Sequence, residues 1–268
     1  MRFLILLLLV PFVQASSCFG GKQRLHEARK GAVRFETKTL QKKLGNCQSP
    51  KGACTQVDLI YPLLAEGPAD LKRAINDTIL AVLIQHFIFE NPTATLTQQA
   101  LERMAENFLL EWQAEKSQHG THEDFPGWEV TVTGEVGLQT GKVAVVSLGT
   151  YSYAGGAHPN SYITIFNFDL RNGSALRWED IVSDTDAVKR LAERAFKAAR
   201  NLPPNADLLE EGYFWGEEFE LPQNFELLEE GIYFWYNPYE VAAWSQGPTD
   251  FLLTYRELGG VIKKDVIF

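Results

Sequence analysis

The segment that decides the fold is VAVVSLGTYSYAGGAHPNSYITIFNFDL, residues 143–170. Apolar and β-branched residues dominate both ends, and they alternate with polar residues toward the middle, which is typical of strands. Between them, Gly155-Gly156-Ala157-His158-Pro159-Asn160 combines residues that favour a loop. We therefore predict two strands, at residues 143–153 and 162–170, joined by a shaped turn.

Further strands surround this pair. Residues 128–133 alternate between apolar and polar side chains, and Gly141 allows a turn between them and the strand that starts at residue 143. We therefore expect an antiparallel meander of three strands. Asn172-Gly173 predicts another tight turn directly after the segment. Four other segments have strand-like patterns: residues 33–40, 55–61 (ending at Pro62), 225–236 (a hairpin turning near Gly231) and 250–255.

Three helices are predicted from apolar residues that recur every three or four positions. The stripes are Leu71, Ile75, Ile79, Leu83 and Phe87; Leu101, Met104, Phe108 and Trp112; and Val188, Leu191, Ala195 and Phe196. Thr95 with Gln98, and Ser183 with Asp186, have capping-box spacing and predict two helix starts. Because strands and helices come in runs, we expect an α+β fold, with helices packed on one face of antiparallel sheets and two small intertwined subdomains.

The first 17 residues have the pattern of an export signal. Arg2 supplies positive charge, Phe3–Val13 is an apolar run, and small residues follow it. A short membrane anchor is the alternative, although the run is too short to span a bilayer. Cys18 comes directly after Ala-Ser-Ser, which resembles the lipobox of bacterial lipoproteins. We therefore expect an exported protein held in the cell envelope by a lipid on Cys18, with plain secretion left open.

The cysteine count bears on the same prediction, since three is an odd number for an exported chain. If Cys18 carries lipid, Cys47 and Cys54 remain as a pair around a short segment that contains Pro50 and Gly52. In an oxidising compartment we expect a disulfide between them, with two free thiols as the alternative. No further ligands stand nearby that would make a metal site.

The charge balance limits the possible partners. The chain of 268 residues has a formal net charge of −9, which argues against nucleic acid and favours a cationic partner. Residues 208–236 contain many glutamates, many aromatic residues and no Lys or Arg. This segment is either a contact surface for a cationic partner or a core whose glutamates face the solvent.

His158 leaves two readings open. A catalytic histidine needs a partner that orients it, and Asp169 or Asp180 could act as the carboxylate of an envelope glycan hydrolase or deacetylase. Alternatively, the glycines and Pro159 shape a rigid turn, and the imidazole only bonds to backbone groups that the turn leaves unpaired. A separate cluster, His119 and His122 with Glu123 and Asp124, is a weak candidate for a metal site.

Several motifs resemble one family of bacterial domain pairs. They are Tyr151-x-Tyr153-x-Gly-Gly-Ala-His158, Phe168-Asp169-Leu170 with Asn172-Gly173, Trp178-Glu-Asp180-Ile181, Gly231-Ile-Tyr-Phe-Trp-Tyr-Asn-Pro238-Tyr239-Glu240 with Trp244-x-x-Gly247, and Cys54-x-x-Val57 with Tyr61-Pro62. Taken in chain order, these motifs resemble, over residues 45–262, the extracellular region of lysozyme-sensing anti-sigma factors (RsiV type). The same pair stands beside the catalytic domain of peptidoglycan deacetylases (PdaC type).

The resemblance implies a binding role without a reaction of its own. The anti-sigma relatives add a transmembrane helix and the deacetylases add a metal-binding catalytic domain, and this sequence contains neither. The expected partner is a cationic lysozyme-like protein or peptidoglycan, with no cofactor, no metal and no catalytic residue. The expected binding residues are Tyr153, Gly155, Gly156, His158, Asn160, Tyr239 and Glu240. The expected parts are a signal peptide (1–17), a tether with the first strand (18–48) and two α+β subdomains (49–163 and 164–268).

Overall fold

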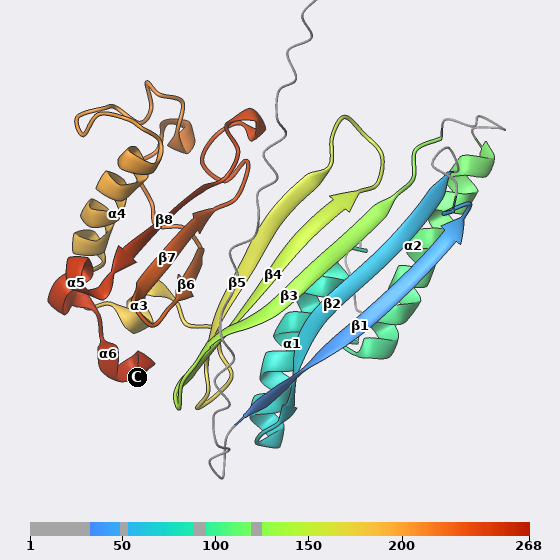
Figure 1. The fold of residues 1–268 in the computed structure, drawn as a ribbon, viewed down its shortest axis with the longest axis horizontal. Coiled ribbons are helices and arrows are strands. Elements are labelled where there is room, and N and C mark those ends of the chain that lie inside the picture. Colours follow the sequence, from blue (N-terminus) through green and yellow to red (C-terminus); the bar gives the residue numbers. More distant parts are fainter. Residues whose placement is uncertain (1–32, 49–52, 88–94, 119–124) are drawn as a thin grey trace, which may run out of the picture. The chain divides into compact units, whose positions relative to one another are not determined.

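The computed structural model describes residues 33–48, 53–87, 95–118 and 125–268, and all of these belong to one compact unit. Two sheets organise them, one of five strands and one of three (Figure 1). Helices lie alongside both sheets, so the α+β class is confirmed. The predicted export signal, the lipidation of Cys18 and the histidine cluster at residues 119–124 lie outside the described residues.

The five-stranded sheet contains the predicted meander. In spatial order its strands are β1 (Arg34–Gly45), β2 (Cys54–Glu66), β3 (Glu129–Gln139), β4 (Val143–Tyr153) and β5 (Asn160–Asp169). All neighbours are antiparallel except β2 and β3. This parallel pair needs a crossover, which α1 (Ala69–Gln85) and α2 (Gln98–Gln118) provide. Both helices cover one face of the sheet (Figure 1), and their predicted apolar stripes pack there.

Strand β4 is buried on both faces, which explains its unbroken apolar run. Val143, Ala144, Val145 and Val146 all have no exposed surface. Val146 packs with the helices α1 and α2. Val143 and Val145 belong instead to a second core, which includes the three-stranded sheet. The two cores therefore share this strand. The predicted subdomain boundary between residues 163 and 164 falls within β5 and stays a prediction.

The second core is built mainly from aromatic side chains. It lies among β6 (Asn224–Leu227), β7 (Gly231–Tyr236), β8 (Thr249–Thr254), α3 (Trp178–Ile181), α4 (Thr185–Ala199), α5 (Tyr255–Leu258) and α6 (Lys264–Ile267). The ring centroid of Trp178 is 4.2 Å from that of Phe225 and 4.9 Å from that of Phe234. Most aromatic residues of the 208–236 segment are thus core residues, as one of the two readings of that segment expected.

Side-chain amides join the two sheets along the outer edge of β5. The Asn237 amide accepts a hydrogen bond from Ile163 N and donates one to Ile163 O, at 2.8 and 2.9 Å. Asn224 Oδ1 accepts from Ile165 N at 2.9 Å. Buried Asn167 donates to Phe225 O at 2.7 Å and accepts from Leu227 N at 3.0 Å. The amides thus form hydrogen bonds with backbone groups on the facing edges of β5 and β6. Without them, these groups would need a further strand as a partner.

The predicted helix starts are wrong by one or two residues. Thr97, not Thr95, caps α2, because its Oγ1 accepts a hydrogen bond from Ala100 N at 3.1 Å. Asp184, not Ser183, caps α4, because its carboxylate accepts from Ala187 N at 2.9 Å. In both cases the cap is the residue three positions before the amide that it satisfies.

The predicted end of the second strand at Pro62 is also wrong, since β2 continues to Glu66 and Pro62 pairs with Thr37 of β1. Two residues later, Leu64 directs its backbone N and O to the side chain of Asn76 on α1, away from β1. Because Pro62 and Leu64 are two residues apart in the strand, their backbone groups face the same edge of β2. That edge pairs with β3 only as far as Ile60, so the missing N–H of Pro62 costs the sheet no hydrogen bond.

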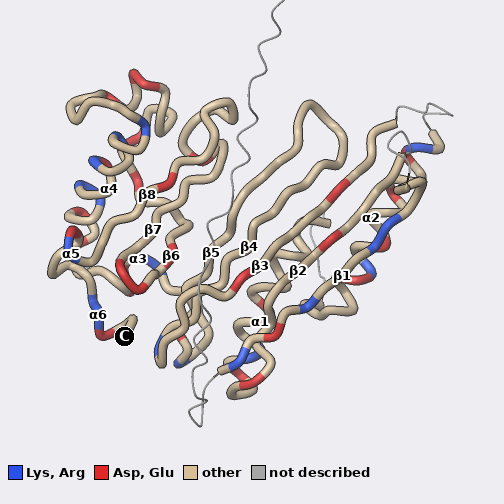
Figure 2. Tube along the Cα trace, viewed as in Figure 1, with Lys and Arg blue, Asp and Glu red and all other residues tan. Residues whose placement is uncertain are grey.

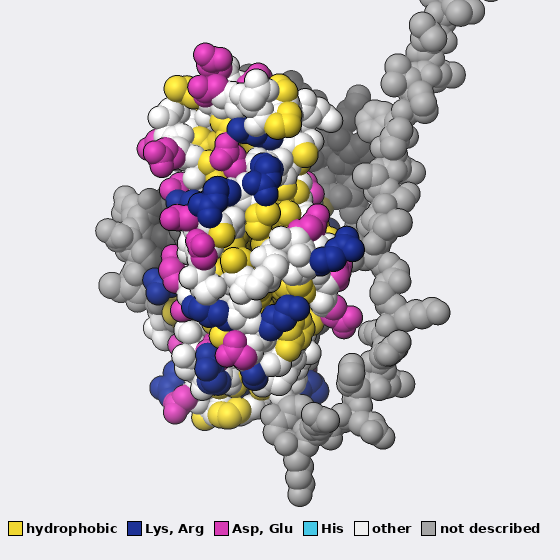
Figure 3. Space-filling view, turned by 90° about the vertical axis from the view of Figure 1, so that its left-hand side faces the viewer, with side chains coloured by type: hydrophobic (Ala, Val, Ile, Leu, Met, Phe, Trp, Pro, Cys, Tyr) yellow, Lys and Arg dark blue, Asp and Glu magenta, His cyan; other side chains and the backbone are white. Residues whose placement is uncertain are grey.

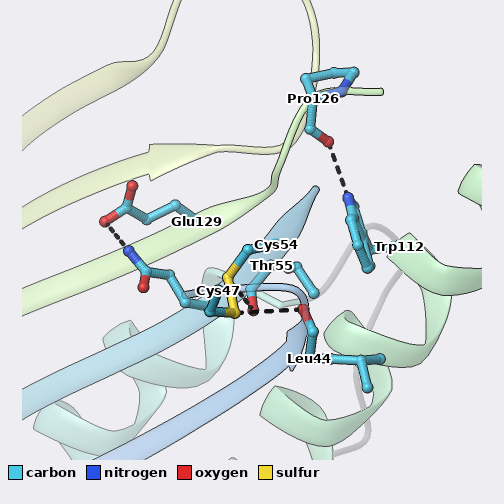
Figure 4. The surroundings of a disulfide bond; sticks show 8 residues. Leu44, Cys47, Cys54, Thr55, Trp112, Pro126 and Glu129 are labelled. Atoms are coloured by element: carbon cyan, nitrogen blue, oxygen red, sulfur yellow. Dashed lines mark hydrogen bonds between the residues drawn. A yellow bond between two sulfur atoms is a disulfide. The ribbon is translucent and has the colours of Figure 1, made fainter. Parts of the chain in front are cut away.

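The predicted disulfide between Cys47 and Cys54 is confirmed. It lies where Gly45 of β1 pairs with Cys54 of β2, so it closes the end of this hairpin (Figure 4). Nearby, Trp112 of α2 donates its indole N–H to Pro126 O at 2.9 Å (Figure 4). The ring of Trp112 also lies against Gly45, where any Cβ would come within 2.5 Å of Ala53 O.

Replacing Asn167 tests the amide junction. Asn167→Ala leaves Phe225 O and Leu227 N unpaired in a buried position, and we expect the free energy of unfolding to fall by about 3 kcal/mol. Urea unfolding measures this loss. Asn205→Ala, at an exposed asparagine, is the matched control and is expected to change stability by less than about 0.5 kcal/mol. Equal stability of the two variants contradicts the assigned role of the junction.

Removing the disulfide tests the hairpin closure. For a loop of this length the chain-entropy model gives a stabilisation of about 2.5 kcal/mol. The double variant Cys47→Ser/Cys54→Ser is therefore expected to unfold at lower urea concentration, and reductant is expected to shift the parent protein but not the variant. A parent protein whose unfolding midpoint does not respond to reductant contradicts this expectation.

Candidate binding surface

The loop between β4 and β5 is a shaped turn. Gly155 and Gly156 have φ angles of +87° and +103°, a region that favours glycine. The phenol of Tyr153 donates a hydrogen bond to Gly156 O at 3.2 Å. His158 Nδ1 lies 2.9 Å from Pro159 O. The backbone and two side chains of the loop thus hold each other in place.

The imidazole of His158 lies in a stack of aromatic rings. Its centroid is 4.5 Å from the Trp244 ring, with 23° between the planes, and 6.2 Å from the Tyr239 ring, with 28°. Its Nε2 lies 3.2 Å from the Tyr239 hydroxyl. When Nδ1 carries the proton and donates to Pro159 O, Nε2 can accept from Tyr239, so one tautomer satisfies both contacts. We call His158, Tyr239 and Trp244 the aromatic rim.

Two rings of the aromatic rim are exposed to solvent, and hydrogen bonds from Arg200 fix the turn that follows one of them. Tyr239 is 54% exposed and Trp244 is 42% exposed. Large exposed aromatic rings in a fixed arrangement are unusual for a surface that binds nothing. Arg200 fixes the turn after Trp244, because its guanidinium donates to Gln246 O, Gly247 O and Thr249 Oγ1 at 2.8–3.1 Å.

The turn that carries Tyr239 is closed by Glu240. Tyr239 has a left-handed φ of +67°, which costs energy for a residue with a side chain. The carboxylate of half-buried Glu240 accepts from Asn237 N at 2.8 Å. Burial raises the pKa of Glu240, and the hydrogen bond from Asn237 opposes this effect. Glu240 therefore supports the turn rather than presenting its charge to solvent.

The structure brings together part of the predicted binding set. His158 and Tyr239 meet, and Tyr153 with the two glycines shapes the loop beneath them. Asn160 opens β5, where it pairs with Ser152, and no contact places it in the rim. Trp244 belongs to the rim but was not among the predicted binding residues. Its only signal was the motif Trp244-x-x-Gly247, because the contact with His158 joins residues far apart in sequence.

No carboxylate orients His158 in the described part of the chain. Asp169 lies at the other end of β5, about 30 Å away along a strand of this length. Its carboxylate is bound by the Arg171 guanidinium, which lowers its pKa. Asp180 accepts a hydrogen bond from Arg177 N. Within the described ranges, no group of three or more His, Cys, Asp or Glu side chains is arranged to hold a metal ion.

The likeness to known families agrees with the motifs. Residues 49–161 match the model described as deacetylase PdaC, and residues 179–256 match DUF3298, a protein family of unknown function. The two matches follow each other in the order of the domain pair that the sequence resembles, so this resemblance is confirmed. No curated protein matches the chain significantly.

Two crystal structures of DUF3298 family members have similar folds. One, from Bacteroides fragilis, is 20% identical with a TM-score of 0.69, and the alignment covers 90% of this chain and 97% of that one. The other, from Pseudomonas aeruginosa, is 21% identical with a TM-score of 0.58 and covers 87% of this chain and 96% of that one. At this identity they establish the fold alone. No helix in the described ranges is long and apolar enough to cross a membrane.

A second histidine has a different environment. His86, directly after α1, is half-buried, with Nδ1 2.7 Å from the Tyr162 hydroxyl and Nε2 3.5 Å from Thr150 Oγ1. Burial lowers the pKa of His86 from 6.5 to about 4. Because the unfolded chain takes up a proton near pH 6.5 and the folded protein does not, stability falls as the pH drops from 6.5 toward 4.

This shift predicts a pH dependence that one substitution removes. Between pH 7 and pH 5 we expect His86 alone to lower the free energy of unfolding by about 2 kcal/mol. In His86→Gln this part of the slope is expected to vanish, because neither state then titrates at this position. Urea unfolding of His86→Gln and the parent protein at the same series of pH values measures it. The same slope in His86→Gln and the parent protein contradicts the assignment.

Proposed function

We propose that this protein is a binding module of the bacterial cell envelope, exported and held there by a lipid on Cys18. Its proposed ligand is a cationic protein such as a lysozyme-like muramidase. The export-signal pattern in the sequence of residues 1–17 and the matches to the PdaC and DUF3298 models support the proposed location. The observation that carries the binding role is the aromatic rim, in which His158, Tyr239 and Trp244 form an exposed stack.

The rim has the physical properties of a protein contact site. Trp and Tyr are enriched among the few residues that supply most of the binding energy in protein interfaces. The shaped loop, the closed turn at Glu240 and the anchoring by Arg200 preorganise the rings, so little conformational entropy is lost on binding. The net charge of −9 attracts a cationic partner from a distance.

Charge and ring surface have separate roles in this proposal. Asp and Glu are spread over both halves of the described chain (Figure 2), so they act mainly on the rate of encounter. The rings supply the short-range contacts and therefore the slow dissociation. The indole of Trp244 and the phenol of Tyr239 can also take an Arg or Lys of the partner against their faces.

Calorimetry with hen egg-white lysozyme as the cationic probe tests the proposal. At low salt we expect binding that weakens as salt is added. Trp244→Ala and Tyr239→Ala are each expected to weaken binding at least about tenfold, while the fold stays intact by circular dichroism. Leu110→Ala is the matched control, because Leu110 is 58% exposed on α2, outside the rim.

The outcomes separate the possible ligands. Absence of lysozyme binding at low salt, or an equal loss in Leu110→Ala, rejects the rim as a site for a cationic protein. Sedimentation with purified peptidoglycan sacculi identifies the other envelope ligand. Binding to sacculi that is lost in Trp244→Ala, without binding to lysozyme, replaces the protein ligand with the glycan.

A further inference from the structure

A groove of about 610 Å³ lies outside the aromatic rim, between α4 and the loop that follows it. Its apolar wall comes from Leu208, Leu209 and Phe219. Leu209 is 57% exposed, although the neighbouring Leu208 is buried. Figure 3 shows the side of the molecule on which α4 lies, with hydrophobic atoms exposed between charged side chains of both signs. The groove thus offers apolar surface that nothing in the described chain covers.

The turn beside the groove is strained and presents a tryptophan. Phe214 and Trp215 both have left-handed φ angles, of 59° and 53°, although neither is glycine. Phe214 is held by a 2.6 Å hydrogen bond from its N to Val241 O, and its ring packs 5.0 Å from that of Phe219. These contacts hold the strained turn in place, and Trp215 stands out from it, 60% exposed.

Acidic side chains outnumber basic ones around the groove. Its lining includes five carboxylates, on Asp186, Glu193, Asp207, Glu217 and Glu218, and two cations, Lys189 and Arg190. Lys189 is bound by Glu220 at 2.6 Å, and Glu193 binds Lys197 at 2.7 Å. Asp207 accepts backbone N–H groups of its own loop. The Glu217 backbone N donates to Phe214 O at 2.8 Å, but the carboxylates of Glu217 and Glu218 form no hydrogen bond or ion pair within the described residues.

We propose that this groove binds a polypeptide segment in which an apolar side chain stands next to a lysine or arginine. The apolar side chain packs against Leu209 and Phe219, next to the turn that carries Trp215. The cation lies against Glu217 and Glu218, where charge complementarity fixes the orientation of the segment. This surface is separate from the aromatic rim, and the proposal holds whether or not the rim binds a cationic protein.

Fluorescence anisotropy with a labelled peptide of Lys-Leu-Ser-Gly repeats tests the groove on the whole protein. We expect saturable binding at about 50 mM salt. The double variant Glu217→Gln/Glu218→Gln and the single variant Trp215→Ala are each expected to weaken it about fivefold or more. The matched charge control is Glu229→Gln/Glu230→Gln, at two exposed glutamates in the turn between β6 and β7. It removes the same charge and is expected to leave binding unchanged.

Two further peptides decide between specific and general attraction. Replacing Leu by Ser in the repeats is expected to weaken binding, because the apolar contact is lost, and replacing Lys by Glu is expected to abolish it. Equal binding of the Leu and Ser peptides, or an equal loss in both double variants, overturns the proposal in favour of non-specific charge attraction. Tighter binding of the Glu peptide, through Lys189 and Arg190, also overturns it, and so does the absence of any binding. Circular dichroism of each variant confirms that the fold is intact.

Discussion

The side-chain amides on the outer edge of β5 are the constraint on which the rest of the structure depends. An edge strand exposes backbone N–H and C=O groups that must find partners when they are covered. Asn237, Asn224 and Asn167 satisfy these groups at Ile163, Ile165, Phe225 and Leu227. The second core can therefore close over this face of β4 without adding a strand to the sheet.

The same junction positions the aromatic rim. Asn237 binds β5 through its side chain and begins the turn that carries Tyr239, while Glu240 holds the backbone of Asn237. Trp235 adds a hydrogen bond from its indole to Asn237 Oδ1 at 2.9 Å. The loop between β4 and β5 reaches the rim from the other sheet. The stack of His158 on Trp244 thus exists only because the two sheets are joined in this register.

Several elements were predictable because their signals are local. The alternation in residues 143–170 placed β4 and β5 closely, the stripes on α1 and α2 are buried as expected, and the cysteine count led to the disulfide. The incorrect predictions concern the exact ends of helices and of one strand. A capping box assigned from spacing alone missed Thr97 and Asp184, because neighbouring residues have similar capping ability. Pro62 was taken as a strand end because nothing in the sequence shows which edge of β2 lacks a partner.

By itself, the sequence determined the class of fold, the apolar faces, the turn at Gly155-Gly156 and the acidic balance, since these follow from composition and from neighbours within a few positions. Only the tertiary structure decided that His158 meets Trp244, that Glu240 turns inward and that Trp215 is exposed beside a groove. Each of these depends on contacts between residues far apart in the chain. Such contacts leave no periodic pattern in a single sequence, because they are set by how the two cores pack around β4 and β5.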